Sequence, residues 1–481
     1  MAGKKVFLTG ATGTMGFQGV LQMLKHPDEI ELSVLVRPSS NRHSDAHRQI
    51  AKFAEDGRLT VISGDLTDRG AIERGVRDAD YVLHVGGMVS PYADHHPEET
   101  MRVNVGGARA IAQAVRKRPD GGKGVKVVYI GSVAQLGHRH WPNVWGRSGD
   151  PVWTSHYDVY AQSKVEAERE ITEAGLPCWV SIRQTGILAP DILMKGTDPI
   201  TFHVPLQGVL EWTNDEDSGR LLANLVLADL PDRFWKRFYN IGNGQNSRLT
   251  NFEFEEIILR HTGCPGTKKI FEPNWFATRN FHGLWYEDSD LLDDYLHYRS
   301  GVSVDGYLER LRKRLPWYFR LTPYIPAFVY KALMKFVASG HPNGTLSWVK
   351  DRNEEKLKVY FGGYDEWQKI PGWDKVKVEF SDEERKPVRL DHGYDESKPE
   401  SELNIDDMRQ AAEYRGGRCL SETMTPGDLD TPLEWECHAG HRFTMTPRLV
   451  LLGGHWCPEC FCLNADYEEI ARHNPFFAQV L

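Results

Sequence analysis

The sequence predicts an α/β protein built on a doubly wound parallel sheet, with a smaller mixed region and a small cysteine-bearing module near its C-terminal end. Three observations support this prediction. Short apolar runs alternate with helical stretches over the first 130 residues. A glycine-rich turn follows the first apolar run, and five of the seven cysteines stand after residue 418. Strands separated by helices are typical of βαβ units, which assemble into parallel sheets.

Seven apolar runs are expected to form the strands of the sheet. They are VFLTG (6–10), LSVLVR (32–37), LTVISGD (59–65), YVLHVGG (81–87), KVVYIGS (126–132), WVSIRQTG (179–186) and RFYNIGNG (237–244). Helices are expected between the first five runs, over 18–25, 43–56, 69–76 and 98–117. Residues 191–340 are less regular and rich in aromatic side chains, so we expect a substrate-binding portion there.

Composition and charge narrow the class of protein. The chain has 58 Lys plus Arg and 67 Asp plus Glu, a formal net charge of −9, which argues against general nucleic-acid binding. No apolar run reaches the roughly 18 residues that suggest a membrane span. The opening MAGKKVFLTG lacks the apolar core and cleavage site of a signal peptide. We therefore expect a cytoplasmic protein.

The glycine-rich turn carries the first functional prediction. It reads Thr9-Gly10-Ala11-Thr12-Gly13-Thr14-Met15-Gly16 and opens a helix. Gly10 allows a tight turn, Gly13 lets the backbone approach a pyrophosphate, and Gly16 lets the helix pack against the strand. The helix N-terminus then faces the phosphates. The turn therefore predicts a Rossmann-type dinucleotide-binding domain.

A tyrosine and a lysine carry the second functional prediction, that of a proton donor. Tyr160 and Lys164 are four residues apart, so they lie on one face of a helix. A nearby ammonium favours the phenolate and is expected to lower the tyrosine pKa from about 10. Ser132, at the end of the fifth strand, is placed to hydrogen-bond the same substrate oxygen. Tyr157 is excluded because Ala161 stands four residues after it.

These motifs, in this order, resemble the extended short-chain dehydrogenase/reductase family over about residues 1–260. The resemblance implies a nicotinamide cofactor and transfer of its pro-S hydride. It also implies a homodimer formed through the helix that carries Tyr160 and its neighbour. Further cofactor-binding positions follow by resemblance: Asp65, Leu66, His84, Val85, Gly86, Gly87, Tyr160, Lys164, Gln184, Thr185 and Gly186.

The sequence departs from the family pattern at a few positions. Gly86 and Gly87 stand where alanines are usual, and Gln184 stands where proline is more common. Asn104 falls at the family's helix asparagine. Its two readings, a structural tie between helix and strand and a support for a proton-relay water, both stay open. We include it with Ser132, Tyr160 and Lys164 as a candidate catalytic residue.

The cofactor preference depends on the end of the second strand. An acidic residue there would favour NAD by binding the ribose 2′-hydroxyl. This chain has Arg37, with Ser39 and Arg42 close behind, and a guanidinium can bind a 2′-phosphate with two hydrogen bonds. We therefore expect NADP, with NAD as the alternative.

The substrate is a small molecule, and an aromatic-lined pocket favours an apolar or ring-containing one. The candidate lining residues are His138, His140, Trp141, Trp145, Trp153, His203, Trp212, Phe281, His282, Trp285 and Tyr286. The expected function is hydride transfer between nicotinamide and a carbonyl or alcohol carbon. The alternatives are an epimerase or dehydratase that retains NAD, a C=C reductase, and an NADP-binding regulatory protein.

The C-terminal cysteines predict a structural zinc site. Cys457 and Cys460 are two residues apart in a turn, and Cys419 and Cys437 supply the other two thiolates. His441 is an alternative to Cys419, and Cys462 is expected to be a bystander. Four protein ligands leave no open position, so we assign the zinc no catalytic role and expect the module to serve packing or oligomerisation.

The domain boundaries follow from these motifs. We expect a dinucleotide-binding domain over 1–260, interleaved with a substrate-binding or lid region over 191–380. Residues 381–407 are charged and poor in apolar side chains, which is typical of a linker. Residues 408–481 form the zinc-ribbon-like module. Residues 316–339 read as a lid, a core helix or a membrane-surface helix, and their prolines favour the first two.

Overall fold

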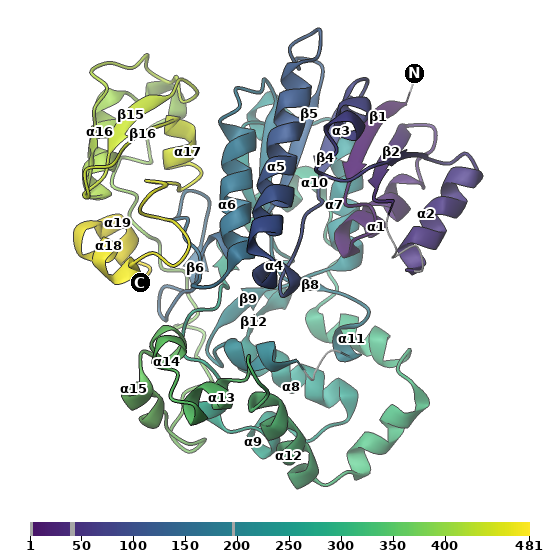
Figure 1. The fold of residues 1–481 in the computed structure, drawn as a ribbon, viewed down its shortest axis with the longest axis vertical. Helices are drawn as coiled ribbons and strands as arrows, with labels where there is room; N and C mark the ends of the chain where they lie inside the picture. Colours follow the sequence, from purple (N-terminus) through teal and green to yellow (C-terminus); the bar gives the residue numbers. More distant parts are fainter. Residues whose placement is uncertain (1–2, 39–43, 195–197) are drawn as a thin grey trace.

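The structure is a computed structural model that describes residues 3–38, 44–194 and 198–481. It has three parts (Figure 1). A helix-covered sheet forms the upper part, a set of short helices and small sheets lies beneath it, and the C-terminal segment packs beside the first part.

The main sheet has seven strands, all parallel, and confirms the predicted fold class. The strands are β1 (Lys4–Thr9), β2 (Ile30–Val36), β3 (Thr60–Ser63), β4 (Tyr81–His84), β5 (Lys126–Ser132), β7 (Trp179–Gln184) and β11 (Arg237–Ile241). Their order is β11-β7-β5-β4-β1-β2-β3. The chain therefore reverses its winding direction between β1 and β4, and open α/β sheets bind ligands at the carboxyl ends of the strands at such a point.

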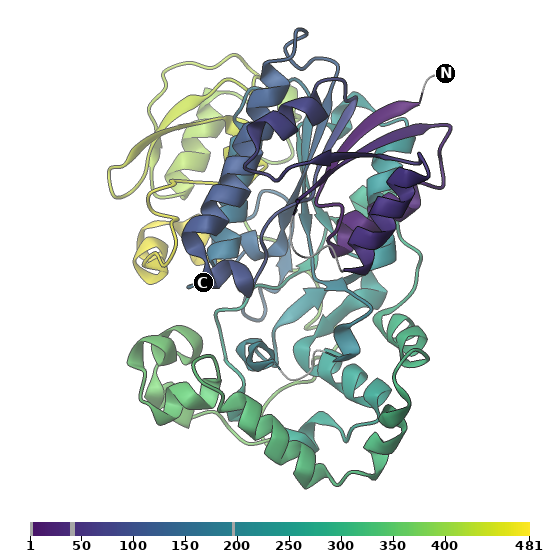
Figure 2. The same cartoon turned by 45° about the vertical axis from the view of Figure 1, so that its right-hand side comes forward.

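Helices cover both faces of this sheet (Figure 2). α3 (Arg69–Val76), α5 (Pro97–Arg116) and α6 (Val159–Thr172) bury one face together with Phe7, while α1 (Thr14–Met23) and α7 (Asp215–Leu227) bury the other with Val6 and Leu8. Successive side chains of a strand point to opposite faces, so β1 supplies both apolar layers. α2 (Asp45–Glu55) and α10 (Ser289–Leu296) add to the second layer.

The part beneath the sheet is built from short elements. Three two-stranded sheets pair β6 (Trp145–Gly146) with β13 (Trp285–Tyr286), β8 (Ile187–Leu188) with β10 (Thr213–Asn214), and β9 (Val209–Glu211) with β12 (Arg248–Thr250). The helices are α8 (Asn251–Thr262), α9 (Thr267–Ile270), α11 (Val304–Arg312), α12 (Ala327–Ala338), α13 (Thr345–Lys350), α14 (Glu354–Phe361) and α15 (Tyr364–Gln368).

The C-terminal module shares a core with the sheet. It contains α16 (Ile405–Tyr414), the antiparallel strands β14 (Arg418–Cys419), β15 (Leu433–Glu436) and β16 (Arg442–Met445), and α17 (Pro447–Leu451), α18 (Tyr467–His473) and α19 (Pro475–Ala478). Its apolar side chains join those under α5 and α6 in one cluster. Trp153, for example, packs edge-on against Tyr467 and Phe477.

The segment expected to be a linker is fixed to the rest of the chain by its charges. Arg147 pairs with Glu396 at 2.7 Å, and His392 contacts Asp150 at 2.9 Å in a buried position. Its charged composition therefore serves contacts between segments as well as exposure to solvent.

Residues 316–339 do not form a core helix, one of the two favoured expectations, and a lid role stays a prediction. Within α12 only Met334, Val337 and Ala338 are buried, and η7 (Trp317–Tyr324), the 3-10 helix before it, buries none of its residues. Most of this segment faces solvent. In the described ranges, no helix combines the length and the apolar character needed to cross a bilayer.

Candidate active site

The glycine turn stands at the carboxyl end of β1, where the winding of the sheet reverses. Gly10 has φ +77°, and a Cβ there would lie 2.6 Å from the backbone nitrogen of Gly86. A Cβ on Gly16 would lie 2.1 Å from the Gly10 carbonyl oxygen. Neither position has room for a side chain. The Gly13 N–H donates to the Gly10 carbonyl at 3.0 Å, and α1 begins at the next residue.

The ends of β1 and β4 are tied together beside this turn. The Thr9 hydroxyl lies 2.9 Å from His84 Nδ1 and accepts a hydrogen bond from the Gly86 N–H at 3.1 Å. Burial, with the charge of Lys164, lowers the pKa of His84 to about 3. His84 is therefore neutral at physiological pH and holds the two strand ends in register.

The remaining predicted cofactor positions surround the same edge. Met15 and Leu66 are buried, whereas Thr12, Thr14 and Gly87 are partly or fully exposed. The Asp65 carboxylate accepts hydrogen bonds from the backbone and hydroxyl of Thr67, which lower its pKa. Val85 directly follows β4, and Gly87 stands two residues further on. Some of the predicted cofactor-binding residues are thus buried or hydrogen-bonded within the protein, and others are exposed and accessible to a ligand.

The structure describes only one of the three residues on which the cofactor preference depends. Arg37 follows β2 directly and is exposed, and its charge adds to burial in lowering the pKa of His47. Ser39 and Arg42 lie outside the described residues.

The loop after β7 offers free polar atoms. Gln184 Oε1 and Thr185 Oγ1 are buried without a hydrogen-bond partner among the described residues, while Gln184 Nε2 donates to the Thr185 carbonyl at 3.1 Å. Gly186 packs against Leu210 and Trp212. Buried polar atoms usually have a partner, so these two oxygens suit a polar ligand in this crevice. Together with the glycine turn they fit a dinucleotide.

Ser132 and Tyr160 meet at the carboxyl end of β5. The Ser132 side chain lies beside the Tyr160 phenol and acts to lower its pKa, and it accepts a hydrogen bond from the Ala134 N–H at 3.2 Å. Burial raises the pKa of Tyr160 to about 12, and the carboxylates of Asp158 and Asp94 act in the same direction. The phenol is therefore protonated at neutral pH and can donate a proton.

Lys164 lies one helical turn further along α6. Its ammonium donates to the Ile130 carbonyl at 2.8 Å and stands 6.0 Å from the centre of the Tyr160 ring. Burial lowers the pKa of Lys164 to about 8, against the opposing charge of Glu168. The expected lowering of the Tyr160 pKa by this lysine is wrong for this structure, because burial of the phenol raises that pKa and Ser132, not Lys164, opposes the rise.

Asn104 makes its contacts within the protein. Its Oδ1 accepts from the Met88 N–H at 2.7 Å, and its Nδ2 donates to the Met88 carbonyl at 3.0 Å and to the Ser163 hydroxyl at 2.8 Å. The side chain therefore ties α5 to the loop after β4 and to α6. This is the structural reading of Asn104, and a role in proton relay stays a prediction.

Two carboxylates near Tyr160 escaped the sequence reasoning. Asp158 caps α6 by accepting from the Ala161 N–H at 2.8 Å, and Asp94 accepts from the Tyr160 N–H at 3.3 Å. An aspartate three residues before a helical N–H is a recognisable capping signal, so Asp158 could have been found. Asp94 reaches the site only through the tertiary fold. His282 Nδ1 lies 3.3 Å from Asp158 and links this helix to a neighbouring pocket.

That pocket has a volume of about 440 Å³ and lies between the sheet domain and the lower helices. Six of the predicted aromatic and histidine side chains line it: His138, His140, Trp141, Trp212, Phe281 and His282. The other five do not, and are Trp145, Trp153, His203, Trp285 and Tyr286. Four of those five are buried in the apolar interior, which is the ordinary place for large aromatic side chains.

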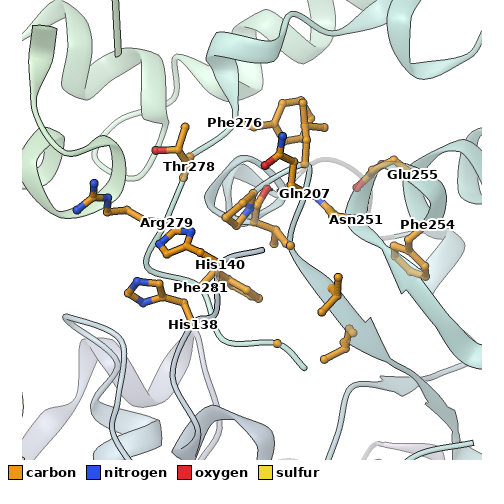
Figure 3. Close-up of a pocket in the computed structure, with 18 of the residues that line it drawn as sticks. His138, His140, Gln207, Asn251, Phe254, Glu255, Phe276, Thr278, Arg279 and Phe281 are labelled. Atoms are coloured by element: carbon orange, nitrogen blue, oxygen red, sulfur yellow. Dashed lines mark hydrogen bonds between the residues drawn. The ribbon is translucent and has the colours of Figure 1, made fainter. Parts of the chain in front are cut away.

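Polar residues of the pocket were not predicted from the sequence. Figure 3 shows Arg279 close to His138 and His140, with Glu255 on the opposite side. Burial and the neighbouring Glu256 raise the pKa of Glu255 to about 7, while burial and Arg279 lower the pKa of both histidines. The pocket thus combines an apolar lining with a cation on one side and a carboxyl group of near-neutral pKa on the other.

The C-terminal cluster differs from the predicted ligand set. Cys437, His441, Cys457 and Cys460 place one ligand atom each within 4.8 Å of one another. His441 Nδ1 lies 3.4 Å from Cys460 Sγ and 3.6 Å from Cys457 Sγ. Cys419 lies outside this group because β14 sets it opposite Trp435. The geometry therefore replaces Cys419 by His441, and three thiolates and one imidazole suit tetrahedral zinc.

The module contacts the helix that carries Tyr160. The Glu168 carboxylate, on α6, lies 2.7 Å from His455 Nε2 and 2.8 Å from the Arg183 guanidinium, and all three side chains are buried. Arg183 also donates to the Gly453 carbonyl at 2.6 Å. Burial lowers the pKa of His455 to about 4. A buried network of the Glu168–Arg183 ion pair and a neutral imidazole therefore joins α6, β7 and the loop that leads into Cys457.

Comparison with known proteins gives three kinds of match. Residues 6–177 match the NAD dependent epimerase/dehydratase family. The chain is 30% identical over 141 residues to 3 beta-hydroxysteroid dehydrogenase type 7 from Homo sapiens, covering 27% of this chain and 37% of that protein. It is 29% identical over 205 residues to uncharacterized protein 052L of Frog virus 3 (isolate Goorha), covering 40% and 54%. The matches span about half or less of these relatives.

Solved structures of similar fold cover more of the chain. A dTDP-glucose 4,6-dehydratase from Streptomyces venezuelae, solved with NAD, has a TM-score of 0.50 at 21% identity and covers 66% of this chain and 98% of its own. A UDP-glucuronic acid 4-epimerase from Bacillus cereus, also solved with NAD, has a TM-score of 0.50 at 17% identity, covering 65% and 100%. These likenesses show the fold.

Proposed function

We propose, from the match of residues 6–177 to the NAD dependent epimerase/dehydratase family, that the chain is an NAD(P)-dependent oxidoreductase. It would transfer a hydride between nicotinamide and a carbonyl or alcohol carbon of a small substrate. The placement of Ser132 beside Tyr160, with Lys164 one turn away on α6, carries this proposal. It stands at the same edge of the sheet as the glycine turn.

The chain's own residues supply the proton chemistry. When bound, the cofactor supplies or accepts the hydride. Tyr160, protonated at neutral pH, donates its proton to the oxygen of a carbonyl that is being reduced. Ser132 hydrogen-bonds the same oxygen and stabilises its developing charge. Lys164 supports the site with a buried positive charge.

The cofactor is held by residues at the reversal of the sheet. The glycine turn and the N-terminus of α1 would take the pyrophosphate. We propose NADP as the preferred cofactor because Arg37 can bind a 2′-phosphate. NAD remains the alternative, and related structures were solved with it.

The pocket favours an apolar or ring-containing substrate. His282 joins its wall to the start of α6, and Phe281, Trp141 and Phe276 contribute apolar surface. Arg279 and Glu255 add polar groups that can orient a substrate. A compact ring with one hydrogen-bonding end fits this lining.

The first test replaces Tyr160 by phenylalanine. We expect turnover with a carbonyl panel to fall by roughly 100-fold or more, since a positioned acid contributes about that much, while NADPH binding persists. Tyr157→Phe is the matched control, because its hydroxyl bonds Glu355 and lies outside the site. A regulatory protein that only binds NADP would show unchanged behaviour in both variants.

A second measurement separates the reductase from an epimerase or dehydratase. Denaturing mass spectrometry of the purified protein would detect NAD that survives purification, which an enzyme regenerating its cofactor at each turnover retains. The NADP-dependent reductase predicts an empty site that takes up NADPH in preference to NADH. A C=C reductase would show the same uptake but act on an activated alkene.

We also propose a zinc ion in the C-terminal module. We assign the metal a structural role, because three thiolates and His441 leave no position for substrate.

A homodimer through α5 and α6 stays our proposal. The groove between these helices, lined by Arg109, Glu166, Arg169 and Glu170, is open along the face that a partner would cover. Sedimentation velocity tests it.

A further inference from the structure

We propose that residues 312–338 dock the protein onto the surface of an anionic lipid bilayer without crossing it. The segment, here named the arm, includes the end of α11, η7 and α12. In Figure 1 it forms the lower edge of the molecule, at the end remote from the N-terminus.

The arm exposes an unusual amount of apolar surface. Nine of the fifteen large apolar side chains that are exposed in the described part of the chain belong to residues 317–336. The exposed fractions are 71% for Trp317, 83% for Tyr324, 73% for Phe328 and 76% for Phe336. Contiguous exposed apolar patches mark interaction sites, and Trp and Tyr are the residues preferred at a membrane interface.

The exposed apolar face of α12 is distinct from the face that packs on the protein. Met334 and Val337 point into a core that includes Phe202 and Phe271. Phe328 and Phe336 lie eight residues apart on the opposite side, as helical periodicity requires. One face of the helix is therefore already buried against the protein, while a second apolar face is exposed to solvent.

Charge around the arm selects the partner. From Arg310 to Lys350 the sequence has eight Lys and Arg and no Asp or Glu, in a chain of net charge −9. Six of these cations are exposed and, among the described residues, form no salt bridge: Arg312, Lys313, Arg314, Arg320, Lys335 and, beyond the arm, Lys350. Lys331 pairs with Glu272.

This charge pattern matches anionic headgroups better than a second copy of the chain. A two-fold interface would place the same patch against itself, and cations would then face cations. Each cation near an anionic bilayer strengthens partitioning by roughly fivefold. Aromatic side chains with flanking cations are the composition of helices that lie in the plane of a membrane.

The arm is held in place, so its outward surface is fixed. The Thr322 hydroxyl donates to the Thr262 carbonyl at the end of α8 at 2.6 Å, and the Tyr330 hydroxyl donates to the Thr322 carbonyl at 2.9 Å. The inner face of α12 also packs in one core with Leu206 and Phe276, which line the pocket. A docked bilayer would thus lie near the wall of the pocket. Any role of the bilayer in delivering substrate to this pocket rests on the proposed function, whereas the docking itself does not.

The test is flotation of the full chain with phosphatidylcholine vesicles, with and without phosphatidylserine. We expect binding that requires phosphatidylserine. Arg320→Gln with Lys335→Gln should weaken partitioning by roughly 25-fold, fivefold for each cation. Trp317→Ser with Phe328→Ser and Phe336→Ser should abolish it. Leu291→Ser with Val388→Ser, which changes exposed apolar residues outside the arm, is the matched control and should bind like the parent.

Three results would overturn the proposal. The parent protein could fail to float with either vesicle, or the arm variants could bind as well as the parent. Alternatively, sedimentation velocity could show a dimer that the arm substitutions dissociate, with no vesicle binding, in which case a second copy covers the face. Circular dichroism and thermal melting verify that each variant is folded. Vesicle binding requires no turnover, so its outcome is independent of the proposed enzyme activity.

Discussion

Lys164 destabilises the fold, because its ammonium is buried in the candidate active site. Its ammonium is buried under Tyr160, and burial lowers its pKa from 10.5 to about 8. The folded pKa therefore lies below the unfolded one, so the unfolded chain binds this proton more tightly. The cost is fully present below about pH 8 and disappears as the pH rises from about 8 to 10.5.

Replacing this lysine should therefore stabilise the fold. A pKa shift of this size corresponds to a destabilisation of roughly 3 kcal/mol that the substitution removes. Loss of the hydrogen bond to Ile130 offsets about 1 kcal/mol of that gain. We expect Lys164→Met to raise the free energy of unfolding at pH 7 by on the order of 2 kcal/mol and to abolish turnover. Urea unfolding at pH 7 and pH 10 checks this, and the gain should shrink at the higher pH. A destabilised variant at pH 7 would contradict it.

At the scale of elements, the contact between α6 and the C-terminal module depends on Glu168. Its buried carboxylate pairs with Arg183 and contacts His455. Burial acts to raise the pKa of Glu168, but these two partners outweigh burial and lower that pKa to about 2. Because the folded pKa lies below the unfolded value of 4.5, this stabilisation is fully present above about pH 4.5 and is lost as the pH falls towards 2.

Removing this carboxylate should weaken the contact between α6 and the C-terminal module and so destabilise the fold. We expect Glu168→Ala to cost about 3–5 kcal/mol, because it leaves Arg183 and His455 buried without their partner. Glu170→Ala is the matched control two residues along the same helix. Its pair with Arg109 is partly exposed, so its loss should cost less than about 1 kcal/mol. Equal losses in chemical unfolding would count against a buried network.

The metal cluster gives a second prediction for an element. Zinc content by elemental mass spectrometry should be one ion per chain, retained in Cys419→Ser and lost in His441→Ala or Cys457→Ser. The reason is geometric, since His441 and not Cys419 lies with the other three ligand atoms. Loss of zinc in Cys419→Ser with retention in His441→Ala would restore the ligand set expected from the sequence.

At the scale of the whole molecule, the shared core predicts cooperative unfolding. Trp153 packs against Tyr467 and Phe477, and the apolar cluster under α5 and α6 continues into the C-terminal module. Calorimetry should therefore show the sheet domain and the module unfolding in one transition. Removing zinc with a chelator should lower that single midpoint, because metal binding contributes folding free energy. Two separate transitions, with only the smaller one sensitive to the chelator, would contradict this.

The sequence by itself determined the parts of this protein that depend on local spacing. All seven strands of the sheet follow from apolar runs, and the turn around Gly10 and Gly16 follows from the glycine spacing. The four-residue step from Tyr160 to Lys164 places them one turn apart on α6. Such features need only neighbours in the chain, and their periodicity is visible in it.

The tertiary structure decided what depends on distant segments meeting. It brought His441 to the cysteines in place of Cys419, set Arg279 and Glu255 across a pocket, and joined Glu168 to His455. It also left one face of α12 without a partner. An apolar pattern indicates that a side chain seeks burial, but packing with the rest of the chain decides which face obtains it, and burial then sets the pKa of groups such as Tyr160.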